Sequence, residues 1–109
     1  MILAIDVGNT NIVLGGIEDG RQRFSVRLAS DRNKTADQYA LDIQGILTMQ
    51  KVKSEDIEGG ILSSVVPYLQ TVIPQAVKSL TGIDLMVVGP GIKTGLNIRM
   101  ETPAPWAAI

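Results

Sequence analysis

Hydrophobic and polar positions follow two different periods along the chain, and each period predicts a type of element. The apolar run at residues 1–5 is typical of a strand buried on both faces, and the run at residues 12–14 is expected to return antiparallel beside it. Between residues 23 and 28, charged or polar positions alternate with apolar ones, as in a half-exposed strand. A meander of three antiparallel strands is therefore predicted to open the fold.

A helical period follows the third strand. Thr35 and Gln38 have the spacing of a capping box, in which each side chain bonds the backbone N–H of the other residue, and they predict a helix over about residues 36–49. The apolar residues that recur on one side of this helix are expected to pack on the sheet: Ala36, Tyr39, Ala40, Ile43 and Leu47. Tyr39 is accordingly interpreted as a core residue and not a site residue.

The rest of the chain alternates between strands and helices. Residues 61–66 predict a strand, and Pro67 is a favoured first helical residue directly after it. This second helix is expected to end at Gly82, with Pro74 removing one helical hydrogen bond and kinking or delaying it. Residues 85–88 predict a further buried strand. The predicted fold class is α/β, a mixed sheet of three antiparallel strands followed by alternating helices and strands, with helices on both faces.

The composition narrows the functions that such a fold can carry. With 109 residues and a hydrophobic content of 45%, the chain is expected to form one domain or part of one. Ten basic and eleven acidic residues leave a net charge of -1, which disfavours nucleic-acid binding. Because the chain contains no cysteine and no histidine, catalysis would depend on carboxylates, amines or hydroxyls. No apolar stretch approaches membrane-spanning length, and we expect a cytoplasmic protein without membrane contacts.

The end of the first strand carries the most informative group of polar residues. Segment 6–11 reads Asp-Val-Gly-Asn-Thr-Asn, and Gly8 and Asn9 tolerate the positive φ that a tight hairpin demands. Backbone N–H groups in such a turn, together with the Thr10 hydroxyl and the asparagine amides, favour phosphate oxygens, and Asp6 would hold Mg²⁺ through water. An ordinary Gly-Asn hairpin with a solvated aspartate is an equally good interpretation of these residues alone.

Two other motifs carry less chemical information. Segment 89–95 is glycine-rich and follows a strand, but Ile92 separates glycine from Lys93, so it lacks the spacing of a nucleotide P-loop and is interpreted as a structural loop. Lys93 could meet an anionic ligand there, although a solvated surface lysine is the more common outcome. Ser63 and Ser64 have no histidine or glycine-flanked elbow to activate them and are interpreted as strand-end capping or loop-positioning groups.

Three segments, taken in order, resemble the signatures of one family. Residues 6–15, 63–67 and 89–96 are similar in order and separation to the amino-terminal half of type III pantothenate kinases, and the resemblance extends to about Pro103. It implies the fold of the actin-like ATPase superfamily, with a ribonuclease H-like half-domain. Members transfer the γ-phosphoryl group of ATP to the hydroxyl of pantothenate, the first step of coenzyme A synthesis. They are homodimers that need Mg²⁺ and a monovalent cation, K⁺ or NH₄⁺.

The resemblance also implies roles for particular residues. The ATP phosphate loop would comprise Asp6, Val7, Gly8, Asn9, Thr10, Asn11, Ile12 and Val13, with Asp6 near the metal. Residues 96–100 would lead into the pantothenate pocket, where Met100 stands in place of a tyrosine found in many members. After Pro103 the family continues into Gly-Ala-Asp-Arg, whose aspartate is the general base. Residues 104–109 read Ala-Pro-Trp-Ala-Ala-Ile instead, so no catalytic residue is expected here, and the monovalent-cation site is expected outside this chain.

The leading hypothesis is that residues 1–109 form an amino-terminal half-domain of a pantothenate kinase that is truncated and inactive alone. The alternative is a degenerate domain of the same fold that binds a nucleotide or a partner without chemistry. A ribonuclease H-like nuclease is disfavoured, because two-metal hydrolysis needs converging carboxylates and neither Glu18 nor Asp84 is expected to meet Asp6. Exposed strand edges and an uncovered sheet face are expected to favour self-association.

Overall fold

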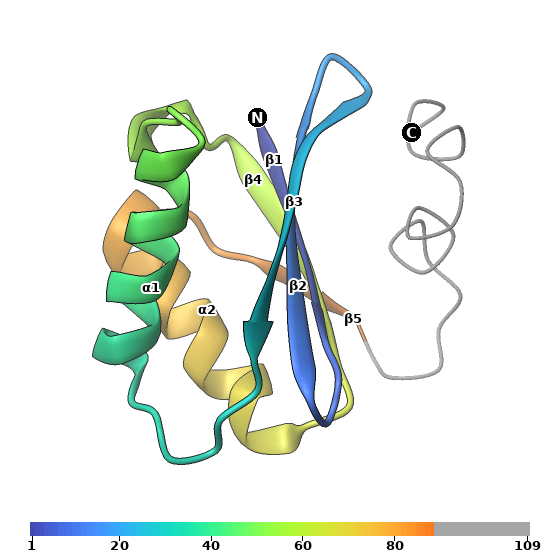
Figure 1. Ribbon diagram of the computed structural model, residues 1–109, viewed down its shortest axis with the longest axis vertical. Coiled ribbons are helices and arrows are strands. Elements are labelled where there is room, and N and C mark those ends of the chain that lie inside the picture. Colours follow the sequence, from blue (N-terminus) through green and yellow to red (C-terminus); the bar gives the residue numbers. More distant parts are fainter. Residues whose placement is uncertain (89–109) are drawn as a thin grey trace.

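The computed structural model describes residues 1–88, which form one sheet and two long helices (Figure 1). In chain order the elements are β1 (Ile2–Val7), β2 (Asn11–Glu18), β3 (Arg21–Ala29), α1 (Ala36–Met49), the short 3₁₀ helix η1 (Ser54–Asp56), β4 (Gly59–Ser64), α2 (Pro67–Thr81) and β5 (Met86–Val88). No helix within residues 1–88 is both long and apolar enough to cross a membrane.

The sheet has the predicted mixed character. Its strand order is β3-β2-β1-β4-β5, with antiparallel pairing of β1 to β2 and of β2 to β3, and parallel pairing of β1 to β4 and of β4 to β5. The predicted opening meander followed by alternating helices and strands is therefore confirmed, but β5 is largely exposed and not buried as predicted. The turn between β2 and β3 is built by Asp19 and Gly20, whose φ values of 54° and 74° suit the right-handed twist of a hairpin.

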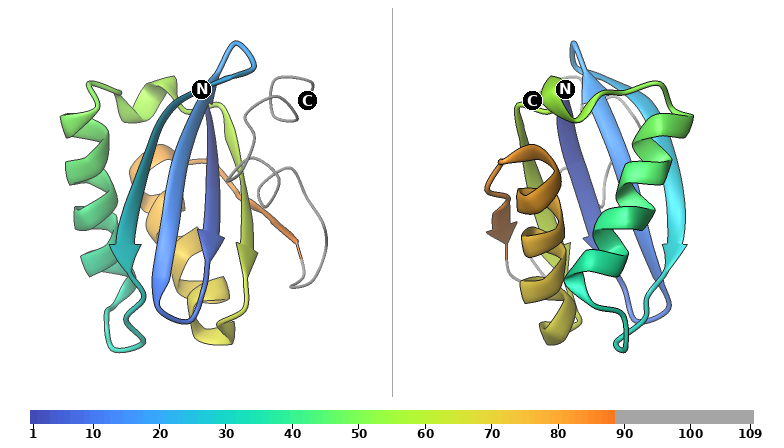
Figure 2. Two further views of the ribbon diagram at one scale, coloured as in Figure 1. Left: turned by 45° about the vertical axis from the view of Figure 1, so that its right-hand side comes forward. Right: turned by 90° about the vertical axis from the view of Figure 1, so that its left-hand side faces the viewer.

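The expectation of helices on both faces is wrong for the described residues. Helices α1 and α2 lie side by side on one face of the sheet (Figure 2). The connection from β3 through α1 to β4 and the connection from β4 through α2 to β5 cross the sheet in the same direction. Since crossovers between parallel strands are right-handed, two crossovers in one direction place both helices on the same face.

The main core lies between this face and the helices. Alternate residues of the central strands point into it, among them Leu3, Ile5, Val7, Ile12, Leu14 and Leu62. The helices contribute Tyr39, Ile43, Ile46, Leu47, Leu69, Val72, Ile73, Ala76 and Val77. The opposite face, which we call the second face, carries Ile2, Ala4 and Asp6 of β1, with Ala4 buried against Ile17 and Ile61. The predicted core role of Tyr39 is confirmed, since its side chain is fully buried.

Local signals located both helices correctly. The capping box of Thr35 and Gln38 is present, and α1 has the predicted bounds. Helix α2 begins at Pro67 and ends at Gly82, which has a left-handed φ of 76°. The expected delay at Pro74 does not occur, because the helix starts before it and continues through it. A single lost hydrogen bond is outweighed by the buried apolar stripe of α2.

Candidate phosphate-binding site

The predicted phosphate turn joins β1 to β2 at the carboxyl end of β1. Because β4 is parallel to β1, its carboxyl end lies at the same edge of the sheet, and the Val65 N–H donates to the Val7 carbonyl across the two strand ends at 3.0 Å. The starts of α1 and α2 lie toward this same end of the molecule (Figure 1). This is the edge at which α/β sheets bind ligands.

The backbone of the turn differs from the predicted hairpin. Gly8 and Asn9 both keep negative φ, so the expectation of positive φ is wrong. One hydrogen bond, from the Gly8 N–H to the Asn11 carbonyl at 2.8 Å, closes the turn, and the Gly8 carbonyl is bound from elsewhere by the Ser30 hydroxyl at 2.7 Å. The tight two-residue loop with reciprocal bonds, which demands positive φ, is therefore not formed.

The turn presents donors to solvent. Asn9, Thr10 and Asn11 are exposed, and within residues 1–88 the N–H groups of Asn9 and Thr10 make no hydrogen bond. A Cβ on Gly8 would lie 3.3 Å from the Asn11 carbonyl oxygen, so glycine suits the close approach of the two strand ends. Two adjacent N–H groups without a partner on an exposed turn form a suitable cradle for an anion.

Asp6 lies one residue before the end of β1. It is half-buried on the second face, and its strand neighbours are Val13 of β2 and Ser63 of β4. No group of three or more potential metal-ligating residues occurs within residues 1–88. A single carboxylate beside a phosphate cradle fits Mg²⁺, which is usually held by one or two carboxylates, water and substrate phosphates.

The apolar members of the predicted loop lie beneath the turn. Val7 and Ile12 are 1% exposed and point into the core, while Val13 is 8% exposed beside Asp6. The side chains of Val7 and Ile12 hold the two strands against the helices, whereas Val13 lies on the second face with Asp6. Only the backbone of these apolar residues could meet a ligand at the turn.

Sequence reasoning missed the contribution of the segment that follows β3. The Ser30 N–H donates to the Thr10 carbonyl at 2.9 Å, in addition to the bond from the Ser30 hydroxyl to Gly8. Arg32 Nη2 donates to Asn9 Oδ1 at 3.4 Å. Strand register provides the signal that could have found them, because Asn11 pairs with Ala29 and the chain after β3 must therefore pass the turn.

Of the two serines of β4, Ser64 has the predicted positioning role. Ser64 is buried, and its hydroxyl accepts from the Val66 N–H at 3.0 Å and donates to the Val66 carbonyl at 2.9 Å. These bonds turn the chain from β4 toward α2, so the strand ends at Ser64 and does not reach the predicted position 66. Ser63 is buried beside Asp6.

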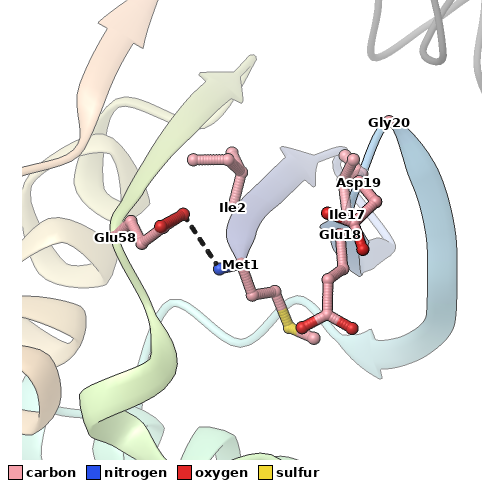
Figure 3. Close-up of a pocket in the computed structure, with 7 residues that line it drawn as sticks. All are labelled: Met1, Ile2, Ile17, Glu18, Asp19, Gly20 and Glu58. Atoms are coloured by element: carbon pink, nitrogen blue, oxygen red, sulfur yellow. Dashed lines mark hydrogen bonds and ion pairs between the residues drawn. The ribbon is translucent and has the colours of Figure 1, made fainter.

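A pocket of about 400 Å³ opens at the opposite end of the sheet (Figure 3). It is lined by Met1, Ile2, Ile17, Glu18, Asp19, Gly20 and Glu58. Its three carboxylates would repel an anion, and the Met1 ammonium pairs with Glu58 at 3.2 Å. Glu18 is therefore far from Asp6, and Asp84 lies before β5 at this same end, so the prediction that these carboxylates do not meet Asp6 is confirmed.

Several predicted features lie outside the described residues. They are the glycine-rich segment 89–95 with Lys93, the substrate-pocket candidate Met100 and the terminal residues with Trp106. Within residues 1–88, the candidate site therefore consists of the turn, Asp6 and the segment after β3.

Comparisons with known proteins agree with the resemblance. The family model for type III pantothenate kinase matches residues 2–106. Type III pantothenate kinases from Bifidobacterium adolescentis and Moorella thermoacetica are 44% and 46% identical over 103 residues, which is 94% of this chain and 40% and 41% of those relatives. The chain thus spans about two fifths of the length of these curated relatives.

A solved structure shows the same fold. The ROK hexokinase from Thermus thermophilus superposes with a TM-score of 0.59 at 16% identity, over 81% of this chain and 33% of the hexokinase. The likeness confirms the predicted α/β fold with its mixed sheet. On the match of the family model over residues 2–106, this chain belongs to the type III pantothenate kinase family.

Proposed function

We propose that this chain provides the phosphate-binding half of a kinase that transfers the γ-phosphoryl group of ATP to the hydroxyl of pantothenate, the first step of coenzyme A synthesis. The observation that carries the proposal is the exposed turn of Gly8, Asn9 and Thr10, with two N–H groups that have no partner within residues 1–88, beside the half-buried carboxylate of Asp6. Membership of the family identifies the reaction class.

Each group of the site has a role suited to its chemistry. The N–H groups of Asn9 and Thr10, the Thr10 hydroxyl and the amides of Asn9 and Asn11 would donate to phosphate oxygens. Asp6 would hold Mg²⁺ through water, and bound Mg²⁺ supplies positive charge that offsets the charge of the phosphates. Phosphoryl transfer depends mainly on such positioning and electrostatic stabilisation.

The proposal extends to parts of the enzyme outside the described residues. The family resemblance supports a pantothenate pocket near Met100, a general base and a monovalent-cation site outside this chain, and a cytoplasmic homodimer. Since the chain spans about two fifths of its relatives, residues 1–109 alone are proposed to bind nucleotide without transferring phosphoryl groups. A degenerate binding domain is the alternative, and activity gained on joining the remaining part of a relative would exclude it.

The turn can be tested by NMR titration of the full 109-residue chain with a magnesium complex of a non-hydrolysable ATP analogue. We expect the amide signals of Asn9 and Thr10 to shift on binding. Asp6→Asn should raise the dissociation constant by roughly 10- to 100-fold, because a contact with a charged group contributes about 1.5–3 kcal/mol. Thr10→Val should weaken binding less.

Asp19→Asn serves as the matched control, because Asp19 is an exposed acid in the turn at the other end of the sheet. The Asp19→Asn variant should bind the ATP analogue with the same dissociation constant as the unmodified chain. Equal binding by Asp6→Asn and the unmodified chain would reject the metal role of Asp6. Unshifted amides at residues 8–11 would reject the phosphate turn itself.

A further inference from the structure

Arg32 reaches the phosphate turn from a different part of the chain. It lies in the connection between β3 and α1, and its guanidinium donates to the Asn9 side chain at 3.4 Å. Arg32 is exposed, and within residues 1–88 it has no carboxylate partner. A full positive charge therefore lies at the edge of a turn whose N–H groups are suited to bind an anion.

The backbone on the amino-terminal side of Arg32 is fixed in two places. Ser30 binds the turn through its N–H and its hydroxyl, at 2.9 and 2.7 Å. The hydroxyl of Tyr39 accepts from the Asp31 N–H at 2.8 Å and donates to the Asp31 carbonyl at 3.0 Å. Because the Tyr39 ring is fully buried in the core, these bonds connect the segment to the body of the domain.

The backbone after Arg32 is also ordered. The Asn33 N–H donates to the Asp31 carboxylate at 2.8 Å, which closes a local turn around Arg32. Its main chain is therefore held on both sides while its side chain extends toward Asn9. Such preorganisation reduces the entropy lost when the side chain binds a ligand.

The nearby cation Lys34 is paired with a residue outside the turn. Its ammonium pairs with Asp42 of α1 at 2.5 Å, and the hydrogen bond that Lys34 donates to that carboxylate raises the pKa of Lys34. The Lys34 ammonium is therefore bound to the middle of α1 and not to the turn. Within residues 1–88, Arg32 is the cation that hydrogen-bonds to the turn, and its partner there is a neutral amide.

We infer that Arg32 is a ligand for the terminal phosphates of the nucleotide bound at the turn. The inference rests on the proposed function. A guanidinium can bind two phosphate oxygens at once, which an ammonium cannot do. Arg32 accordingly favours nucleoside triphosphates over monophosphates, and Ser30 is a positioning residue for it.

The experiment is the same NMR titration, performed with the magnesium complex of the ATP analogue and separately with AMP. For Arg32→Gln we expect the dissociation constant of the triphosphate to rise about 10- to 100-fold, and that of AMP to stay within about twofold. Arg32→Lys should recover only part of the loss, since it restores the charge but not the two-point geometry. Ser30→Ala should lower triphosphate affinity by a smaller factor.

Arg21→Gln is the control, because Arg21 is an exposed arginine at the opposite end of the sheet. It should bind both nucleotides as the unmodified chain does. If the unmodified chain binds the triphosphate and Arg32→Gln binds it equally well, the inference is overturned while the proposed function stands. If no amide of the turn shifts in the unmodified chain, both are overturned.

Discussion

Glycines in this chain serve opposite purposes depending on what surrounds them. A Cβ built on Gly16 would lie 2.3 Å from Cε2 of Phe24 and within 2.9 Å of two further ring atoms. Gly16 also adjoins the register shift in the pairing of β2 with β3. By contrast, a Cβ on Gly45, in the middle of α1, would meet no atom within 4 Å. Of these two positions, packing requires glycine at position 16 but not at position 45.

The two alanine substitutions should therefore have opposite effects. Gly16→Ala should lower the free energy of unfolding by about 1–3 kcal/mol, because the buried Phe24 ring must move. Gly45→Ala should raise it by about 0.5–1 kcal/mol, because glycine disfavours the helix interior. Urea denaturation of the two variants and the unmodified chain measures both changes. A stabilised Gly16→Ala variant would contradict the packing argument.

At the scale of the element, the start of α1 connects fold and site. Thr35 accepts a hydrogen bond from the Gln38 N–H at 3.2 Å, and the Gln38 side chain accepts from the Thr35 N–H at 2.8 Å. The segment that carries Arg32 ends at this cap, and one turn further on Tyr39 bonds back to Asp31. The same helix start therefore stabilises α1 and positions the loop beside the phosphate turn.

Removing the cap tests this connection. Thr35→Ala should lower the free energy of unfolding by about 1 kcal/mol, the usual contribution of a threonine cap. Thr48→Ala is the matched control: its hydroxyl only bonds back to the Gln44 carbonyl within the helix, and its loss should change stability by less than about 0.5 kcal/mol. Thermal unfolding followed by circular dichroism gives both values. Equal effects of the two substitutions would argue against the cap.

At the scale of the whole molecule, the two faces of the sheet differ in how far helices cover them. Both described helices cover one face, while on the second face Ile2 is 39% and Met86 is 64% exposed. Strand β5, only three residues long, forms one edge of the sheet. Within residues 1–88 no strand pairs with the outer edge of β5, and exposed apolar residues beside such an edge favour association with another protein surface.

We therefore predict that the chain self-associates at high concentration through the second face and the β5 edge. Met86→Lys should shift the population toward monomer, because the charge would be desolvated on association. Met49→Lys on the outer side of α1, where Met49 is 76% exposed, should leave association unchanged. Sedimentation velocity over a concentration series measures the shift. A strictly monomeric unmodified chain would refute the prediction.

The sequence by itself determined the elements, the caps and the place of the candidate site. Thr35, Pro67 and Gly82 mark helix ends through interactions within a few residues, and the run before Asp6 marks a buried strand through its composition. Such short-range signals do not depend on the rest of the fold. The order of family motifs, also readable without coordinates, identified the family.

Only the tertiary structure decided how these elements meet. Both helices lie on one face because successive right-handed crossovers run in one direction across the sheet. Gly8 and Asn9 keep negative φ because the Ser30 hydroxyl, 22 residues further along the chain, binds the carbonyl that a tight hairpin would use. Arg32 reaches Asn9 because strand register brings the end of β3 to the turn. No local pattern encodes contacts between segments so far apart in the sequence.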